Sequence, residues 1–170
     1  MDFLLIFAIL VVLVLIFWQD LRERAVSWYF FPLLFVLVFL YRIKSAGVES
    51  LVENIGINSL FLLVQLVMVS LYFSLKNREW VNITKEYLGI GDVLFLFVIT
   101  PLFTPVLYVM FYLISLFLIV VVAMLVKVIK NYQKTIPLAG LQALLLSGLL
   151  LTDIYVIKFD DQYILNYLFI

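Results

Sequence analysis

Two aspartates stand where apolar stretches give way to polar ones, and they are the residues of this chain best suited to chemistry. Asp20 follows the first apolar run, and Asp92 precedes another. An ionised carboxylate loses hydration beside a membrane segment, so its presence there indicates a function by default. Two carboxylates about 3 Å apart cannot both ionise cheaply, and they titrate as a coupled pair. One can take a proton from water while the other gives one to a carbonyl oxygen, which hydrolyses a peptide bond without a metal or an organic cofactor.

The residues around the two aspartates favour a shaped site over isolated charges. Gly89 and Gly91 flank Asp92 on its N-terminal side, and glycine permits close approach of a second helix or a substrate strand. Arg22 and Arg24 are close enough in sequence to steer a substrate or to tune Asp20, and anchoring the chain at the membrane face is an equal alternative for them. The same pattern also fits a plain helix start, and membrane proteins use buried carboxylates in structural and transport roles too.

Composition excludes several other classes of function. Of the 170 residues, 67% are hydrophobic and 13% charged, which exceeds the roughly half apolar content of soluble domains. The formal net charge is zero, so the chain lacks the basic footprint of a nucleic-acid-binding protein. Histidine and cysteine are both absent, which excludes Ser-His and Cys-His nucleophiles and the usual zinc ligands. The chain is expected to be an integral membrane protein embedded in a lipid bilayer.

The apolar runs predict an all-α, polytopic membrane protein, a bundle of six transmembrane helices that forms one domain over residues 1–170. A spanning helix needs about 20 apolar residues, and two prolines four apart divide the run from 93 to 126. Residues 44–54 are expected to form a loop, and residues 152–170 an interfacial segment. The predicted spans are 3–18, 28–41, 55–75, 93–100, 106–126 and 136–151.

The distribution of Lys and Arg predicts the orientation, because cytoplasmic loops carry an excess of them. Three basic residues lie on one predicted side, at Arg42, Lys44 and Lys158. The loops after the first, third and fifth spans hold the other eight of eleven and are expected to face the cytoplasm from the cell inner (plasma) membrane. Both aspartates then lie on the cytoplasmic side. These eight residues are Arg22, Arg24, Lys76, Arg78, Lys85, Lys127, Lys130 and Lys134.

Three segments resemble the type IV prepilin peptidases, membrane aspartic proteases that include the archaeal preflagellin peptidases. Gly-Ile-Gly-Asp-Val at 89–93 is similar to the second-aspartate motif, and Asp-Leu-Arg at 20–22 to the first. Thr-Ile-Pro-Leu-Ala-Gly at 135–140 resembles the start of the last span and includes Pro137. The resemblance implies that Asp20 and Asp92 are catalytic. It also implies cleavage of prepilin, pseudopilin or preflagellin-like substrates at the cytoplasmic membrane face.

The chain departs from that family at two places. Val26-Ser27 stands where the family usually has Ile-Pro, and Leu94 stands where it often has Lys. A non-catalytic transport or scaffold protein, or an inactive peptidase homologue, therefore stays open as the alternative. Presenilin-type intramembrane proteases share Gly-x-Gly-Asp, but they add a Pro-Ala-Leu segment that this sequence lacks. Because the chain starts at the first span and has no cysteine, no methyltransferase segment is expected.

Overall fold

The described part of the chain, residues 2–78, 89–130 and 138–155 of the computed structural model, is entirely helical apart from short connections. This confirms the predicted all-α class for these residues. Their six helices are α1 (Asp2–Glu23), α2 (Phe30–Ala46), α3 (Val48–Asn77), α5 (Ile90–Val98), α6 (Pro105–Lys130) and α7 (Leu138–Tyr155).

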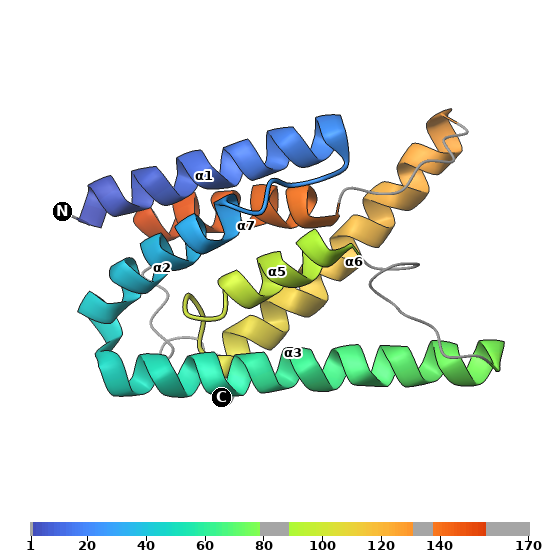
Figure 1. Ribbon diagram of the computed structural model, residues 1–170. Coiled ribbons are helices and arrows are strands. Elements are labelled where there is room, and N and C mark those ends of the chain that lie inside the picture. The colour runs from blue at the N-terminus through green and yellow to red at the C-terminus, as the bar shows by residue number, and fades with distance from the viewer. Residues whose placement is uncertain (1, 79–88, 131–137, 156–170) are drawn as a thin grey trace, which may run out of the picture.

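Helix α7 is central to the arrangement, because it packs against α1, α5 and α6. Figure 1 shows α7 antiparallel to α1, with α2 leading from the end of α1 to α3 along the opposite edge of the bundle. Helices α5 and α6 fill the space between these two edges. The last turn of α1 and the first turns of α5 and α7 consequently lie at the same end of the bundle, which we call the aspartate end.

Small side chains explain how closely α1 and α7 approach one another. Ala139 and Ala143 of α7 are buried, as are Ile9, Leu13 and Ile16 on one face of α1. These α1 residues are spaced four and three apart, so they form one apolar stripe along the helix. Small residues let helix backbones come close within a membrane, where packing drives association. The pairing of α1 with α7 therefore follows directly from the sequence of both helices.

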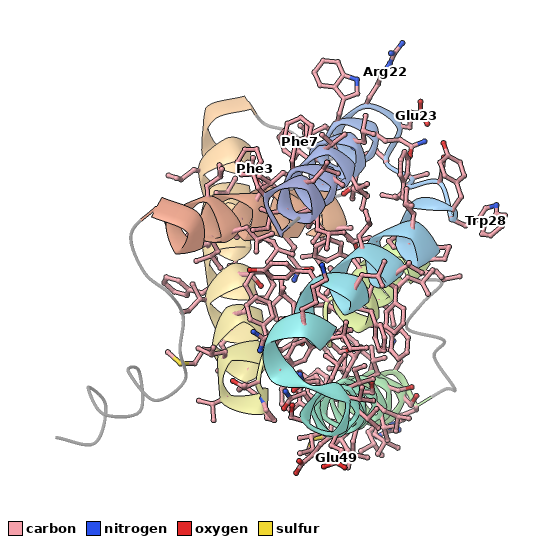
Figure 2. All side chains as sticks on the ribbon, turned by 90° about the vertical axis from the view of Figure 1, so that its left-hand side faces the viewer. Phe3, Phe7, Arg22, Glu23, Trp28 and Glu49 are labelled. Carbon is pink, nitrogen blue, oxygen red and sulfur yellow. The ribbon has the colours of Figure 1, made fainter. Side chains whose placement is uncertain are left out.

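Among the described residues, three helices are long and apolar enough to cross a membrane, over Phe3–Glu23, Val48–Asn77 and Pro105–Val122. Large apolar side chains also face outward from the bundle. Phe3 and Phe7 of α1, for example, are 72% and 60% exposed, and Figure 2 shows both on the outside of that helix. Because lipid tails solvate such side chains and water does not, these features suggest a multi-pass membrane protein.

Several helix boundaries differ from the predicted spans, since α2 ends at Ala46 and α7 continues to Tyr155, and two further differences affect the connections between helices. The rest of the interfacial segment expected at 152–170, from 156 on, lies outside the described residues. Helix α1 continues to Glu23, so Asp20 lies within its last turn and not in the polar turn expected after residue 18. Helix α3 begins at Val48, so the loop expected at 44–54 is reduced to Gly47, whose φ of 77° ends α2. Charged residues do not end a helix where it extends beyond the apolar part of the bundle, as at the end of α1 and the start of α3. The break between α2 and α3 therefore occurs at Gly47 alone, where the positive φ ends the helix.

The predicted break at the two prolines is confirmed, since α5 ends at Val98 and α6 begins at Pro105. Proline is well suited to the first position of a helix because its missing N–H has no intrahelical acceptor there. Asn58 of α3 donates from its side-chain nitrogen to the carbonyl oxygens of Thr100 and Phe103, both at 2.9 Å. We call this the turn end of the bundle, and it lies opposite the aspartate end (Figure 1).

Candidate active site

Asp20 and Asp92 both reach the first turn of α7. The amide of Gly140 donates to Oδ2 of Asp20 at 2.6 Å, and the amide of Ala139 donates to Oδ1 of Asp92 at 2.8 Å. Three bonds of about 1.3 to 1.5 Å join the nitrogens of consecutive residues, so these two oxygens lie within about 10 Å of each other. Two residues 72 positions apart in the sequence are thus held by adjacent main-chain groups.

The start of a helix is a suitable place for two carboxylates. The first four N–H groups of a helix lack intrahelical acceptors, and the helix dipole adds partial positive charge there. Helix α7 begins at Leu138, so the amides of Ala139 and Gly140 belong to this unpaired set. The last turn of α1 and the first turn of α5 each bring one aspartate to α7, which satisfies two of its amides with charged acceptors.

Asp92 is also fixed within its own helix. It is the third residue of α5, and its Oδ2 accepts a hydrogen bond of 3.1 Å from the amide of Gly89, which precedes the helix. An acidic side chain at this position commonly reaches back in this way. A Cβ at Gly89 would lie 3.0 Å from Oδ2 of Asp92, whereas one at Gly91 would lie 3.7 Å from Cζ of Phe31. Of the two predicted glycines, Gly89 is therefore the one that Asp92 requires.

Gly140 has a still closer relation to Asp20. A Cβ at Gly140 would lie 2.9 Å from Oδ2 and 3.0 Å from Cβ of Asp20, distances that real Cβ atoms hardly ever show. Asp20 is buried here, with 6% of its surface exposed. The sequence prediction included Pro137 in the site but not Gly140. The available signal was a glycine three residues after that proline, at the start of the last apolar run.

Burial and the second carboxylate both change the acidity of Asp92. The net effect of its surroundings raises the pKa of Asp92 from 3.8 to about 6. Desolvation by burial is the largest cause, the hydrogen bonds from the Ala139 and Gly89 amides oppose the rise, and the charge of Asp20 adds to it. Asp92 consequently holds a proton well above the pH at which an exposed aspartate loses it. Because each carboxylate affects the other, the two groups titrate as a pair.

Of the two arginines that the sequence suggested beside Asp20, Arg24 is the one that acts on it. The guanidinium of Arg24 interacts electrostatically with Asp20, and the φ of Arg24 is 57°, a left-handed conformation just past the end of α1. Arg22 is exposed, and Figure 2 shows it projecting away from the bundle. Pro137, the remaining predicted site residue, lies outside the described residues.

The candidate site consists of two carboxylates that accept hydrogen bonds from the amides at the start of α7. Within residues 2–78, 89–130 and 138–155, no group of three or more His, Cys, Asp or Glu side chains is placed to hold a metal ion. Comparisons with protein-family models, with curated proteins and with solved structures found no match. A functional interpretation therefore depends on the geometry of the aspartates and on the motifs of the sequence.

Proposed function

We propose that this chain is a membrane aspartic endopeptidase that removes the leader peptide of prepilin-like proteins at the cytoplasmic membrane face. The observation that carries the proposal is the convergence of Asp20 and Asp92 on consecutive amides of α7. The resemblance of the segments around these residues to prepilin peptidases supplies the substrate class. Six spans, with both aspartates on the cytoplasmic side, complete the proposed topology.

The chemistry needs one carboxylate ionised and the other protonated. The ionised group takes a proton from a water molecule while the water oxygen attacks the scissile carbonyl carbon, and the protonated group gives its proton to the carbonyl oxygen. When the tetrahedral intermediate collapses, the C–N bond breaks and the leaving amine takes a proton from the pair. The raised pKa of Asp92 supports this scheme, because it keeps a proton on the pair up to about pH 6, well above the range of an exposed aspartate.

The absence of the family's Ile-Pro after the first aspartate is compensated locally. The amide of Ser27 donates to Oε1 of Gln19 at 2.9 Å, and Nε2 of Gln19 donates to the hydroxyl of Ser27 at 2.7 Å. Proline could not donate the first of these hydrogen bonds. The reciprocal pair fixes the turn between α1 and α2, so the backbone after Asp20 is held without a proline ring.

Co-expression with a prepilin-like substrate tests the proposal. Asp20→Asn and Asp92→Asn keep the size of each side chain but remove its acid–base function. We expect each to lower the rate of leader removal, followed on a gel, by about 100- to 10,000-fold. Glu49→Gln is the matched control, because Glu49 is an exposed carboxylate at the start of α3. Processing at the normal rate by either aspartate variant would remove that residue from the mechanism. A wild-type chain that binds the substrate without cleaving it would favour the scaffold alternative.

The orientation is tested separately by labelling. The chain has no cysteine, so Asp20→Cys and Asp92→Cys each create a single reactive thiol. In intact cells, a membrane-impermeant maleimide should label neither position, and after permeabilisation it should reach position 92, which is partly exposed. Labelling of position 92 from outside the cell would contradict the proposed cytoplasmic site.

A further inference from the structure

The first turn of α7 contacts the two aspartates in different ways. Asp20 lies against the α-carbon of Gly140, at a distance that leaves no room for a side chain. Asp92 contacts the preceding residue of α7, because its carboxylate accepts a hydrogen bond from the amide of Ala139. The aspartates come from two other helices, α1 and α5, so α7 is the element that they share.

We propose that the first turn of α7 positions the aspartate pair, and that Gly140 is the positioning residue whose missing side chain lets Asp20 reach its amide. This inference rests on the proposed function, because it assigns Gly140 a part in the same reaction. Gly140 is not itself catalytic, since its contribution passes through the carboxylate of Asp20.

An added methyl group at position 140 has a specific consequence. Helix α1 packs along α7, so the two helices must shift apart to relieve the contact with Cβ of Asp20, and the carboxylate must rotate away from the Gly140 amide. Asp20 would then lose its hydrogen bond of 2.6 Å and its fixed distance from Asp92. A misplacement of about 1 Å in a catalytic group can lower the rate about 100-fold.

The Ala139 amide can be removed without adding bulk near Asp20. Ala139→Pro deletes the N–H that donates to Asp92, and a proline is tolerated in the first turn of a helix. For Gly140→Ala the matched control is Gly148→Ala in the same helix, since a Cβ at Gly148 meets nothing within 4 Å.

The pH profile of processing separates positioning from a general effect on folding. Displacing Asp20 weakens its charge effect on Asp92, so the pKa of Asp92 should fall and the limb of the profile that it sets should move to lower pH. Near α1, the charge of Asp20 acts on Asp92, and the charge of Arg24 acts on Asp20. The titratable residues of α2 and α7 lie towards the C-terminal ends of those helices, away from Asp92.

We expect Gly140→Ala and Ala139→Pro each to lower the processing rate about 100-fold, with a shifted profile for Gly140→Ala. Gly148→Ala should stay within about twofold of the wild type. A wild-type rate and profile in Gly140→Ala would overturn the inference. An equal loss of rate at every pH in both test variants, with thermal unfolding unchanged, would overturn it as well.

A measurement independent of activity keeps the inference testable when a variant does not fold. In ¹⁵N-labelled wild-type protein in detergent, the amide resonances of Ala139 and Gly140 should titrate as the carboxylates ionise. Asp20→Asn should abolish the titration at Gly140, and Asp92→Asn that at Ala139. If neither amide titrates, the positioning role is wrong. If both titrate while no substrate is cleaved, only the proposed function fails.

Discussion

The aspartate end and the turn end of the bundle both bury polar side chains against main-chain groups, but the side chains donate hydrogen bonds at one end and accept them at the other. At the turn end, the neutral side chain of Asn58 donates to two carbonyl oxygens between α5 and α6. At the aspartate end, the acidic side chains of Asp20 and Asp92 accept from two amides at the start of α7. One end pairs neutral groups, and the other brings two potential charges together.

This difference indicates which end serves stability and which serves chemistry. A buried carbonyl without a donor costs about 1–3 kcal/mol, so Asn58 is sufficiently explained by the two carbonyls it pairs. A single neutral acceptor would satisfy each amide at the start of α7 equally well. Placing two mutually repelling acids there is an electrostatic cost that hydrogen bonding alone does not require. The turn end can therefore be explained by folding, whereas the aspartate end needs a function.

The largest stability effect should come from the turn end. Asn58→Leu would leave the carbonyls of Thr100 and Phe103 without their donor, and we expect the free energy of unfolding to fall by about 2–6 kcal/mol. Ser59→Ala is the matched control, because the buried hydroxyl of Ser59 has no hydrogen-bond partner in the described part of the chain, and its loss should be neutral or stabilising. Denaturant titration in detergent measures both. Similar values for the two variants would contradict the role given to Asn58.

The next largest effect should be a pH dependence of stability, which arises from Asp92 at the aspartate end. The folded state raises the pKa of Asp92 from 3.8 to about 6, so it binds a proton more tightly than the unfolded chain does. The contribution of Asp92 to stability is therefore complete below about pH 4 and is lost as the pH rises through about 6. At about 1.4 kcal/mol for each unit of pKa, the loss is at most about 3 kcal/mol.

Thermal unfolding across this pH range, with Asp92→Asn as the comparison, measures that contribution. The wild-type unfolding temperature should decline between about pH 4 and 6, and the decline should be smaller in the variant, which has no proton to release at this position. Asn58→Leu should keep the wild-type dependence, because it acts at the other end. An equal decline in Asp92→Asn would show that Asp92 does not titrate as the structure indicates.

Local sequence patterns were enough to predict an all-α chain and to single out the two aspartates that contact α7, because both predictions follow from the cost of placing polar groups beside apolar ones. The boundaries of α1 and α3 were misjudged, since charged residues such as Glu49 do not end a helix that leaves an apolar layer. Gly140 was missed because its role depends on the approach of Asp20 from 120 residues away. The glycine three residues after Pro137 is visible in the sequence, but its neighbours in the chain do not show that Asp20 lies against it.

The smallest predicted effect concerns the joint between α2 and α3. Gly47 has a φ of 77°, where an L-residue is strained, so Gly47→Ala should lower the free energy of unfolding by about 1 kcal/mol. Gly56→Ala, within α3 and with open space around its Cβ, should raise it by up to about 1 kcal/mol, because alanine favours the helix. Both variants should process substrate like the wild type, since neither residue touches the aspartates. Opposite signs for two identical substitutions would show that backbone conformation, and not side-chain volume, fixes the joint, and equal signs would contradict that explanation.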